Sequence, residues 1–130
     1  MKKLSFLLLL IIFLACEKET VDPHDQVSIL NEWELISTFN PWTQETTILA
    51  DIDRLEVYDF RDNDSLYIYV NNDLDKVMPY ILNEVIDADT VRTLQMGENG
   101  PFDAITLTHN TLVIDQTPYD GFRFNFIKRD

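Results

Sequence analysis

From about residue 27 onward, apolar and polar residues alternate with a period of two, and turn-forming residues interrupt the pattern at short intervals. In one such run Leu66, Ile68 and Val70 share a face, while Tyr67 and Tyr69 share the other. Period two is typical of half-buried β-strands. We predict about eight short strands, at residues 32–39, 55–60, 66–70, 80–86, 91–96, 104–108, 111–116 and 122–126.

Clusters of Asp, Asn, Pro and Gly separate these strands, as at residues 61–64, 71–73 and 117–121. No convincing helix interrupts the series, although residues 27–34 could form a short helical turn and residues 43–52 are ambiguous. Short strands at regular spacing favour an antiparallel barrel or sandwich. We expect an all-β, antiparallel up-and-down β-barrel of about eight short strands in one domain, residues 27–130, because 130 residues are too few for two ordinary domains.

The first fifteen residues have the composition of a secretory signal peptide. Lys2 and Lys3 precede an apolar run, residues 4–15, that is short for a membrane-spanning helix. The run ends in Phe-Leu-Ala-Cys, which resembles the bacterial lipobox. That resemblance implies cleavage after residue 15, lipidation of Cys16, and a lipid anchor in the cell envelope, at the outer membrane. Residues 16–26 are then the lipidated cysteine and a polar tether.

Cys16 is the only cysteine, which excludes an internal disulfide and a CxxC redox pair. The net charge is −13, and removal of the signal peptide takes away two lysines and no acids. Such a surface repels nucleic acid and anionic lipid head groups, so the acyl anchor would supply the attachment to the membrane. A solvated surface is one interpretation of this charge, and a basic protein partner is the other.

Catalytic chemistry has little support. Only two histidines occur, His24 in the tether and His109 in a tight turn, and neither a GxSxG motif nor a Gly-rich phosphate loop is present. We expect no enzyme activity, no cofactor and no metal. Carboxylates occur in Asp-x-Asp pairs that suit turns better than a weak calcium site or a glycosidase pair: Asp51/Asp53, Asp62/Asp64, Asp73/Asp75 and Asp87/Asp89.

Three stretches, at residues 30–37, 105–114 and 122–129, resemble the opening strand, the penultimate hairpin and the closing strand of lipocalin-like lipoproteins of Bacteroidota. The opening strand of that family carries Gly-x-Trp-x-Leu, and Asn31 stands here at the glycine position before Trp33. The resemblance implies a barrel in which Trp33 closes one end and Lys128 or Arg129 lies over its ring, a structural cation–π contact.

Two functions remain open at this point. A membrane-anchored lipocalin-like barrel would bind a small apolar or amphipathic ligand, with Tyr67 and Tyr69 as candidate lining residues. Alternatively, side chains fill the barrel, as is common with eight strands, and its acidic surface is a protein-interaction module. A cavity of several hundred Å³ would favour the first.

Overall fold

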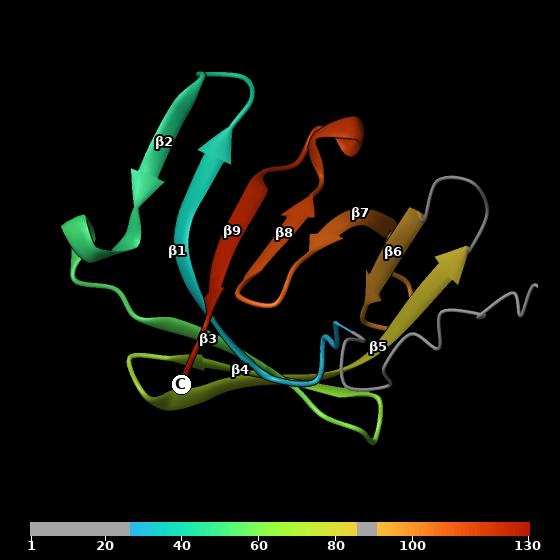
Figure 1. The fold of residues 1–130 in the computed structure, drawn as a ribbon. Coiled ribbons are helices and arrows are strands. Elements are labelled where there is room, and N and C mark those ends of the chain that lie inside the picture. The colour runs from blue at the N-terminus through green and yellow to red at the C-terminus, as the bar shows by residue number, and fades with distance from the viewer. Residues whose placement is uncertain (1–26, 86–90) are drawn as a thin grey trace, which may run out of the picture.

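The computed structural model describes residues 27–85 and 91–130. These residues form one antiparallel sheet of nine strands, and eight of the strands close into a barrel because β9 pairs with β1 (Figure 1). This confirms the predicted all-β barrel. The strands are β1 (Glu32–Asn40), β2 (Glu45–Ile48), β3 (Glu56–Phe60), β4 (Ser65–Val70), β5 (Asp73–Val85), β6 (Val91–Met96), β7 (Phe102–Leu107), β8 (Thr111–Asp115) and β9 (Arg123–Lys128). Two 3₁₀ turns complete the described chain, η2 (Leu49–Ile52) and η3 (Thr117–Tyr119).

Strand β1 closes the barrel along one edge, and two different strands pair with its other edge. Along one edge it pairs with β9, with Trp33 opposite Lys128. Its pairing with β3 runs only from Glu32 to Glu34, and from Ser37 onward it pairs with β2 instead. Strand β2 is therefore the ninth strand, outside the closed ring, and β1 leaves a fork between β2 and β3 (Figure 1).

Side chains fill the middle of the barrel. Trp33, Leu94 and Leu112 are fully buried there. Aromatic rings pack in tilted or edge-on pairs, Tyr58 with Phe126 at 4.9 Å and Phe60 with Tyr80 at 5.1 Å between centroids. Such offset geometries are the favourable ones for aromatic side chains. Side chains rather than an open lumen therefore occupy the middle of this eight-stranded barrel.

Leu66 and Ile68 point inward as the alternation predicts, and Phe126 is buried with Phe124 packed beside it. The alternation of Phe122, Phe124 and Phe126 also predicts Phe122 on this inner face, and that prediction is wrong. It precedes β9 and is 43% exposed, because the chain is still leaving the turn at Gly121.

Three segments differ from the predicted elements. Strand β5 is longer than expected and begins at Asp73, which was assigned to a turn. A β-bulge opposite Ile68 and Tyr69 breaks its alternation, and Pro79 further obscures the strand pattern. The ambiguous residues 43–52 contain β2 and η2. The helical turn considered for residues 27–34 does not form, since strand β1 already begins at Glu32.

Candidate functional site: a cavity at one end of the barrel

The segment that enters the barrel, residues 27–31, lies against one of its ends and is called the strap below. Ile29 of the strap is only 3% exposed and belongs to the core cluster. Its carbonyl accepts a hydrogen bond of 2.9 Å from the indole Nε1 of Trp33. The side chain of Ser28 accepts a hydrogen bond from the backbone N–H of Leu30, which orders the strap locally. The buried indole therefore fixes the strap to the barrel.

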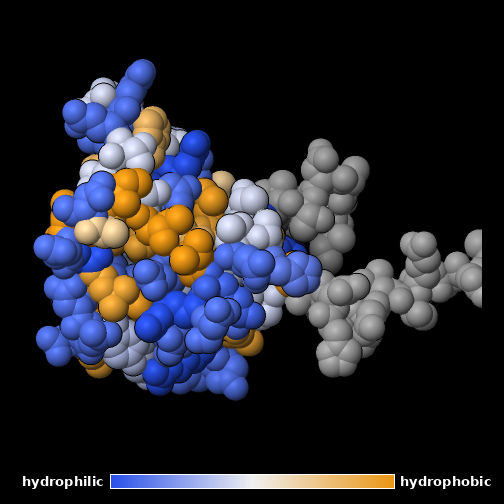
Figure 2. Space-filling model, turned by 60° about the vertical axis from the view of Figure 1, so that its left-hand side comes forward, coloured by the Kyte–Doolittle hydropathy of each residue, from blue (hydrophilic) through white to orange (hydrophobic). Residues whose placement is uncertain are grey.

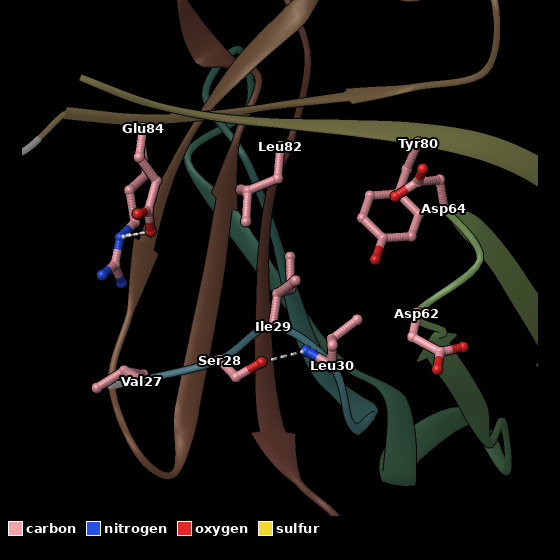
Figure 3. Close-up of a pocket in the computed structure, with 10 residues that line it drawn as sticks. Val27, Ser28, Ile29, Leu30, Asp62, Asp64, Tyr80, Leu82 and Glu84 are labelled. Atoms are coloured by element: carbon pink, nitrogen blue, oxygen red, sulfur yellow. Dashed lines mark hydrogen bonds and ion pairs between the residues drawn. The ribbon is translucent and has the colours of Figure 1, made fainter. Parts of the chain in front are cut away.

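Between the strap and the barrel wall lies a cavity of about 550 Å³, called the end cavity below. The turn between β3 and β4, together with β5 and β6, forms its other walls (Figure 3). The size falls within the range of about 300–1,000 Å³ that is usual for small-molecule sites. Its lining residues are Val27, Ser28, Ile29, Leu30, Asp62, Asp64, Tyr80, Leu82, Glu84 and Arg92.

Apolar side chains occupy the centre of the end cavity and charged ones lie at its two sides. Leu82 extends from β5 toward Ile29 and Leu30 of the strap (Figure 3). On one side Glu84 and Arg92 form an ion pair, with 2.7 Å between Arg92 Nε and Glu84 Oε1. They are opposite each other in the β5–β6 ladder, on the same inward face as Tyr80 and Leu82. The ion pair therefore lies on the inward face of the sheet, where both side chains remain partly exposed at the end of the barrel.

On the other side, Tyr80 holds the turn that carries Asp62 and Asp64. Its backbone N–H donates to the Asp64 carbonyl at 3.0 Å, and its hydroxyl donates to the Arg61 carbonyl at 2.9 Å. Burial raises the pKa of the Tyr80 hydroxyl, and the charges of Asp64 and Asp62 raise it further. The turn is possible because Asp64 accepts a left-handed backbone, with φ of 57°. Both carboxylates are therefore held at the rim of the end cavity.

This arrangement suits the binding of an amphipathic molecule. An apolar centre with a charged rim matches a molecule that has an apolar body and a polar head. The lining contains three carboxylates, those of Asp62, Asp64 and Glu84, and a single guanidinium, that of Arg92, so the rim is acidic. Among the residues that the structure describes, no group of three or more His, Cys, Asp and Glu side chains could hold a metal ion.

A buried acid that the sequence patterns did not single out lies elsewhere in the barrel. Asp103 of β7 is 1% exposed, and its Oδ2 accepts a 2.7 Å hydrogen bond from Gln116 Nε2. Its Oδ1 is buried without a hydrogen-bond partner. Burial raises the pKa of the Asp103 carboxyl, although the bond from Gln116 acts in the opposite direction. The sequence does contain a signal for its burial, because Asp103 lies two residues before the inward-facing Ile105 and so shares its face of β7.

The residues expected to close the barrel lie on β1 and at the C-terminal end of β9. Trp33 is completely buried, and Lys128 lies opposite it in the β1–β9 ladder. Arg129, however, has a different neighbour from the expected indole ring. Its Nη1 lies 3.2 Å from Glu32 Oε2, on the outer face of β1. The two cation–π contacts of residues 27–85 and 91–130 join Arg61 to Tyr67 and Arg123 to Phe39, and neither involves Trp33.

The remaining candidates are scattered. Cys16, His24 and the Asp87/Asp89 pair lie outside the described residues. His109 is exposed in the turn between β7 and β8, as expected. Of the other Asp-x-Asp pairs, only Asp62/Asp64 lines the end cavity, while Asp73/Asp75 lies within β5. Tyr67 and Tyr69 lie beside Arg61 on the outer face, so neither lines the end cavity, and Tyr69 borders only a hollow of about 150 Å³ beside Val57.

Comparison of the chain with family models, with curated proteins and with solved structures finds no match. The fold and the end cavity are therefore the basis for a functional argument. Within residues 27–85 and 91–130, no helix has the length and apolar character needed to cross a bilayer.

Proposed function

We propose that this chain is a lipid-anchored lipoprotein whose barrel binds a small amphipathic molecule in the end cavity. The observation that carries the proposal is the 550 Å³ volume with an apolar centre, Ile29, Leu30 and Leu82, between charged sides. The filled middle of the barrel limits the ligand to this end. A wholly apolar ligand fits less well, because burying Glu84 and Arg92 against it would desolvate both charges.

The position of the end cavity supports the anchoring part of the proposal. Val27 lines the cavity, and it lies eleven residues after Cys16 in the sequence. An extended chain of that length reaches at most about 40 Å. An acyl chain on Cys16 would therefore keep the end cavity close to the membrane surface, where amphipathic molecules concentrate.

The acidic rim favours a ligand with a cationic head over one with an anionic head. Asp62 and Asp64 are at the turn, and Arg92 is already paired with Glu84. An ammonium group at this rim would be attracted by Asp62 and Asp64, whereas a carboxylate would be repelled. The apolar body would then lie over Leu82 and Ile29.

The test is calorimetric titration of the full chain in lipid nanodiscs with octylamine, octanol and octanoate, using empty nanodiscs as the blank. We expect octylamine to bind most tightly and octanoate least. Leu82→Gln should weaken binding of all three, and Ile81→Gln is the matched control, since Ile81 is the preceding residue of β5 and is 51% exposed. Absence of binding by all three ligands would contradict the ligand-binding proposal.

The anchoring proposal has a separate test. Mass spectrometry of the chain from a bacterial host should show a mature N-terminus at Cys16 that carries acyl groups, and Cys16→Ser should abolish both. An unmodified Cys16 in the purified chain would contradict the anchor and leave the cavity argument intact.

A further inference from the structure

The fork between β2 and β3 contains a second opening, called the fork groove below, with a volume of about 640 Å³. It forms because β1 pairs with β3 only through Glu34 and with β2 only from Ser37 onward. The turn between β4 and β5, with Asn71 and Asn72, closes its far side. The fork groove is therefore a consequence of the ninth strand and is separate from the end cavity.

The walls of the fork groove are mainly apolar. Leu35 and Leu49 are buried at its base, with 3% and 4% exposed. Ile36 and Ile48 line it while remaining 37% and 42% exposed, and Ile52 of η2 is 56% exposed. Figure 2 shows apolar side chains gathered below the projecting β1–β2 hairpin and surrounded by hydrophilic ones. Exposed aliphatic clusters with a polar border are typical of interaction sites.

A free strand edge lies beside these residues. Strand β2 pairs with β1 along one edge, and within residues 27–85 and 91–130 no strand pairs with its other edge. All four residues of β2 are exposed. An unpaired edge presents backbone N–H and C=O groups to any extended chain that reaches it. Addition of a strand to such an edge is a common mode of peptide recognition.

The charges around the fork groove determine which kind of partner segment it would attract. Asp53 lines it, and Asp51 and Glu45 lie on the adjoining η2 and β2. The one guanidinium in its lining, that of Arg54, is engaged by Glu56 at 2.9 Å. A second copy of this chain, with a net charge of −13, would be repelled. A basic segment would be attracted to the same border.

We propose that the fork groove docks an extended segment of a basic partner protein, in which apolar residues alternate with Lys or Arg. Its backbone pairs with the free edge of β2, its apolar side chains contact Ile36 and Ile48, and its cations lie near Asp51 and Asp53. This interaction site is independent of the ligand proposed for the end cavity, so either proposal can fail without the other.

The experiment uses the ¹⁵N-labelled full chain in nanodiscs and a capped peptide of alternating Lys and Val as the probe. We expect amide shifts confined to β2, η2 and neighbouring β1. The double variant Ile36→Thr and Ile48→Thr should weaken binding about tenfold or more, since each change removes apolar contact and retains strand propensity. The matched control is Ile81→Thr together with Ile127→Thr, which replaces exposed isoleucines of β5 and β9.

Three results would overturn the proposal. A Glu–Val peptide that binds as tightly would show that the acidic border does not select the partner. A Lys–Val peptide with alternate backbone nitrogens methylated, if it binds as tightly as the parent, would exclude strand pairing. Concentration-dependent shifts of β2 in the chain alone would show that a second copy occupies the fork groove.

Discussion

The end cavity and the fork groove of the barrel form in the same way, but their surfaces differ chemically. At each one, a segment outside the closed ring inserts one aliphatic side chain into the core, Ile29 from the strap and Leu49 from η2. The end cavity beyond Ile29 has an ion pair and two further carboxylates, whereas the fork groove beyond Leu49 is mainly aliphatic. In the strap and in η2, therefore, one residue closes the barrel, while other residues of the same segment form the surface that is open for binding.

The largest effect is expected from removing the indole that holds the strap. Trp33→Ala should reduce the free energy of unfolding by about 3–5 kcal/mol, because a completely buried aromatic ring and its hydrogen bond to Ile29 are both lost. Urea denaturation measures this change. Trp42→Ala is the control, since Trp42 is 71% exposed and its loss should cost less than about 0.5 kcal/mol. Equal losses for the two variants would contradict the role of Trp33.

Replacing Leu49, the corresponding residue at the fork, should have a somewhat smaller effect on stability. Leu49→Ala should cost about 2–4 kcal/mol in the free energy of unfolding, because the cavity it leaves adds to the lost burial. The exposed neighbour Ile52 of the same 3₁₀ turn provides the control variant Ile52→Ala. If Leu49→Ala is no more costly than Ile52→Ala, Leu49 does not close the fork.

A third prediction concerns Asp103, the buried acid of β7. Burial raises the pKa of Asp103 above its ordinary value of 3.8, so the folded chain holds the proton more tightly than the unfolded chain. The free energy of unfolding should therefore fall as pH rises from about 4 through the raised pKa. Asp103→Asn should remove this slope and add about 1–2 kcal/mol at neutral pH, since the carboxylate carries a buried, unpartnered oxygen.

The matched comparison for Asp103 is Asp115 of the neighbouring strand. Burial acts to raise the pKa of Asp115, but hydrogen bonds from Thr117 and the contact with Arg123 outweigh it and lower the pKa. Its stabilising contribution is present above the ordinary pKa and is lost as pH falls through the lowered value. Asp115→Asn should thus destabilise at neutral pH. Denaturation profiles between pH 3 and 8 distinguish the two acids, and stabilisation by both variants would contradict the assignment.

The smallest effect on stability is expected at the end cavity itself. Glu84→Gln breaks the ion pair with Arg92, and both side chains are partly exposed, so the cost should stay below about 1 kcal/mol. The change should instead appear in ligand binding. Octanoate should bind more tightly, because Arg92 is then free to attract its carboxylate. A loss of several kcal/mol with unchanged ligand preference would assign a structural rather than a binding role to the pair.

The sequence predicts those strands in which inward positions are uniformly apolar. Strand β4 is the clearest, since Leu66 and Ile68 are buried in it while Tyr67 and Tyr69 are not. Strand β2 has no such signal, because all of its residues are exposed and it packs no face against the core. In β5 the bulge shifts the phase of the alternation near Asp75, so the first half of the strand loses its pattern.

The end cavity could not be predicted from local pattern, because its walls come from the strap, a turn and two strands far apart in sequence. One signal was present, however. Glu84 continues the inward phase of Tyr80 and Leu82, and Arg92 continues that of Leu94 in the facing strand. Two oppositely charged residues that share the inward face of paired strands predict an ion pair on that face, once the register of the pairing is known. The register itself depends on tertiary pairing.

A map of amide shifts in the full chain, in nanodiscs, as octylamine is added would locate the bound molecule. We expect shifts at the strap, at Tyr80, Leu82 and Arg92, and at the turn with Asp62 and Asp64, with β2 and η2 unchanged. Shifts confined to Ile36, Ile48 and η2 would show that the fork groove binds the small molecule and would contradict binding in the end cavity.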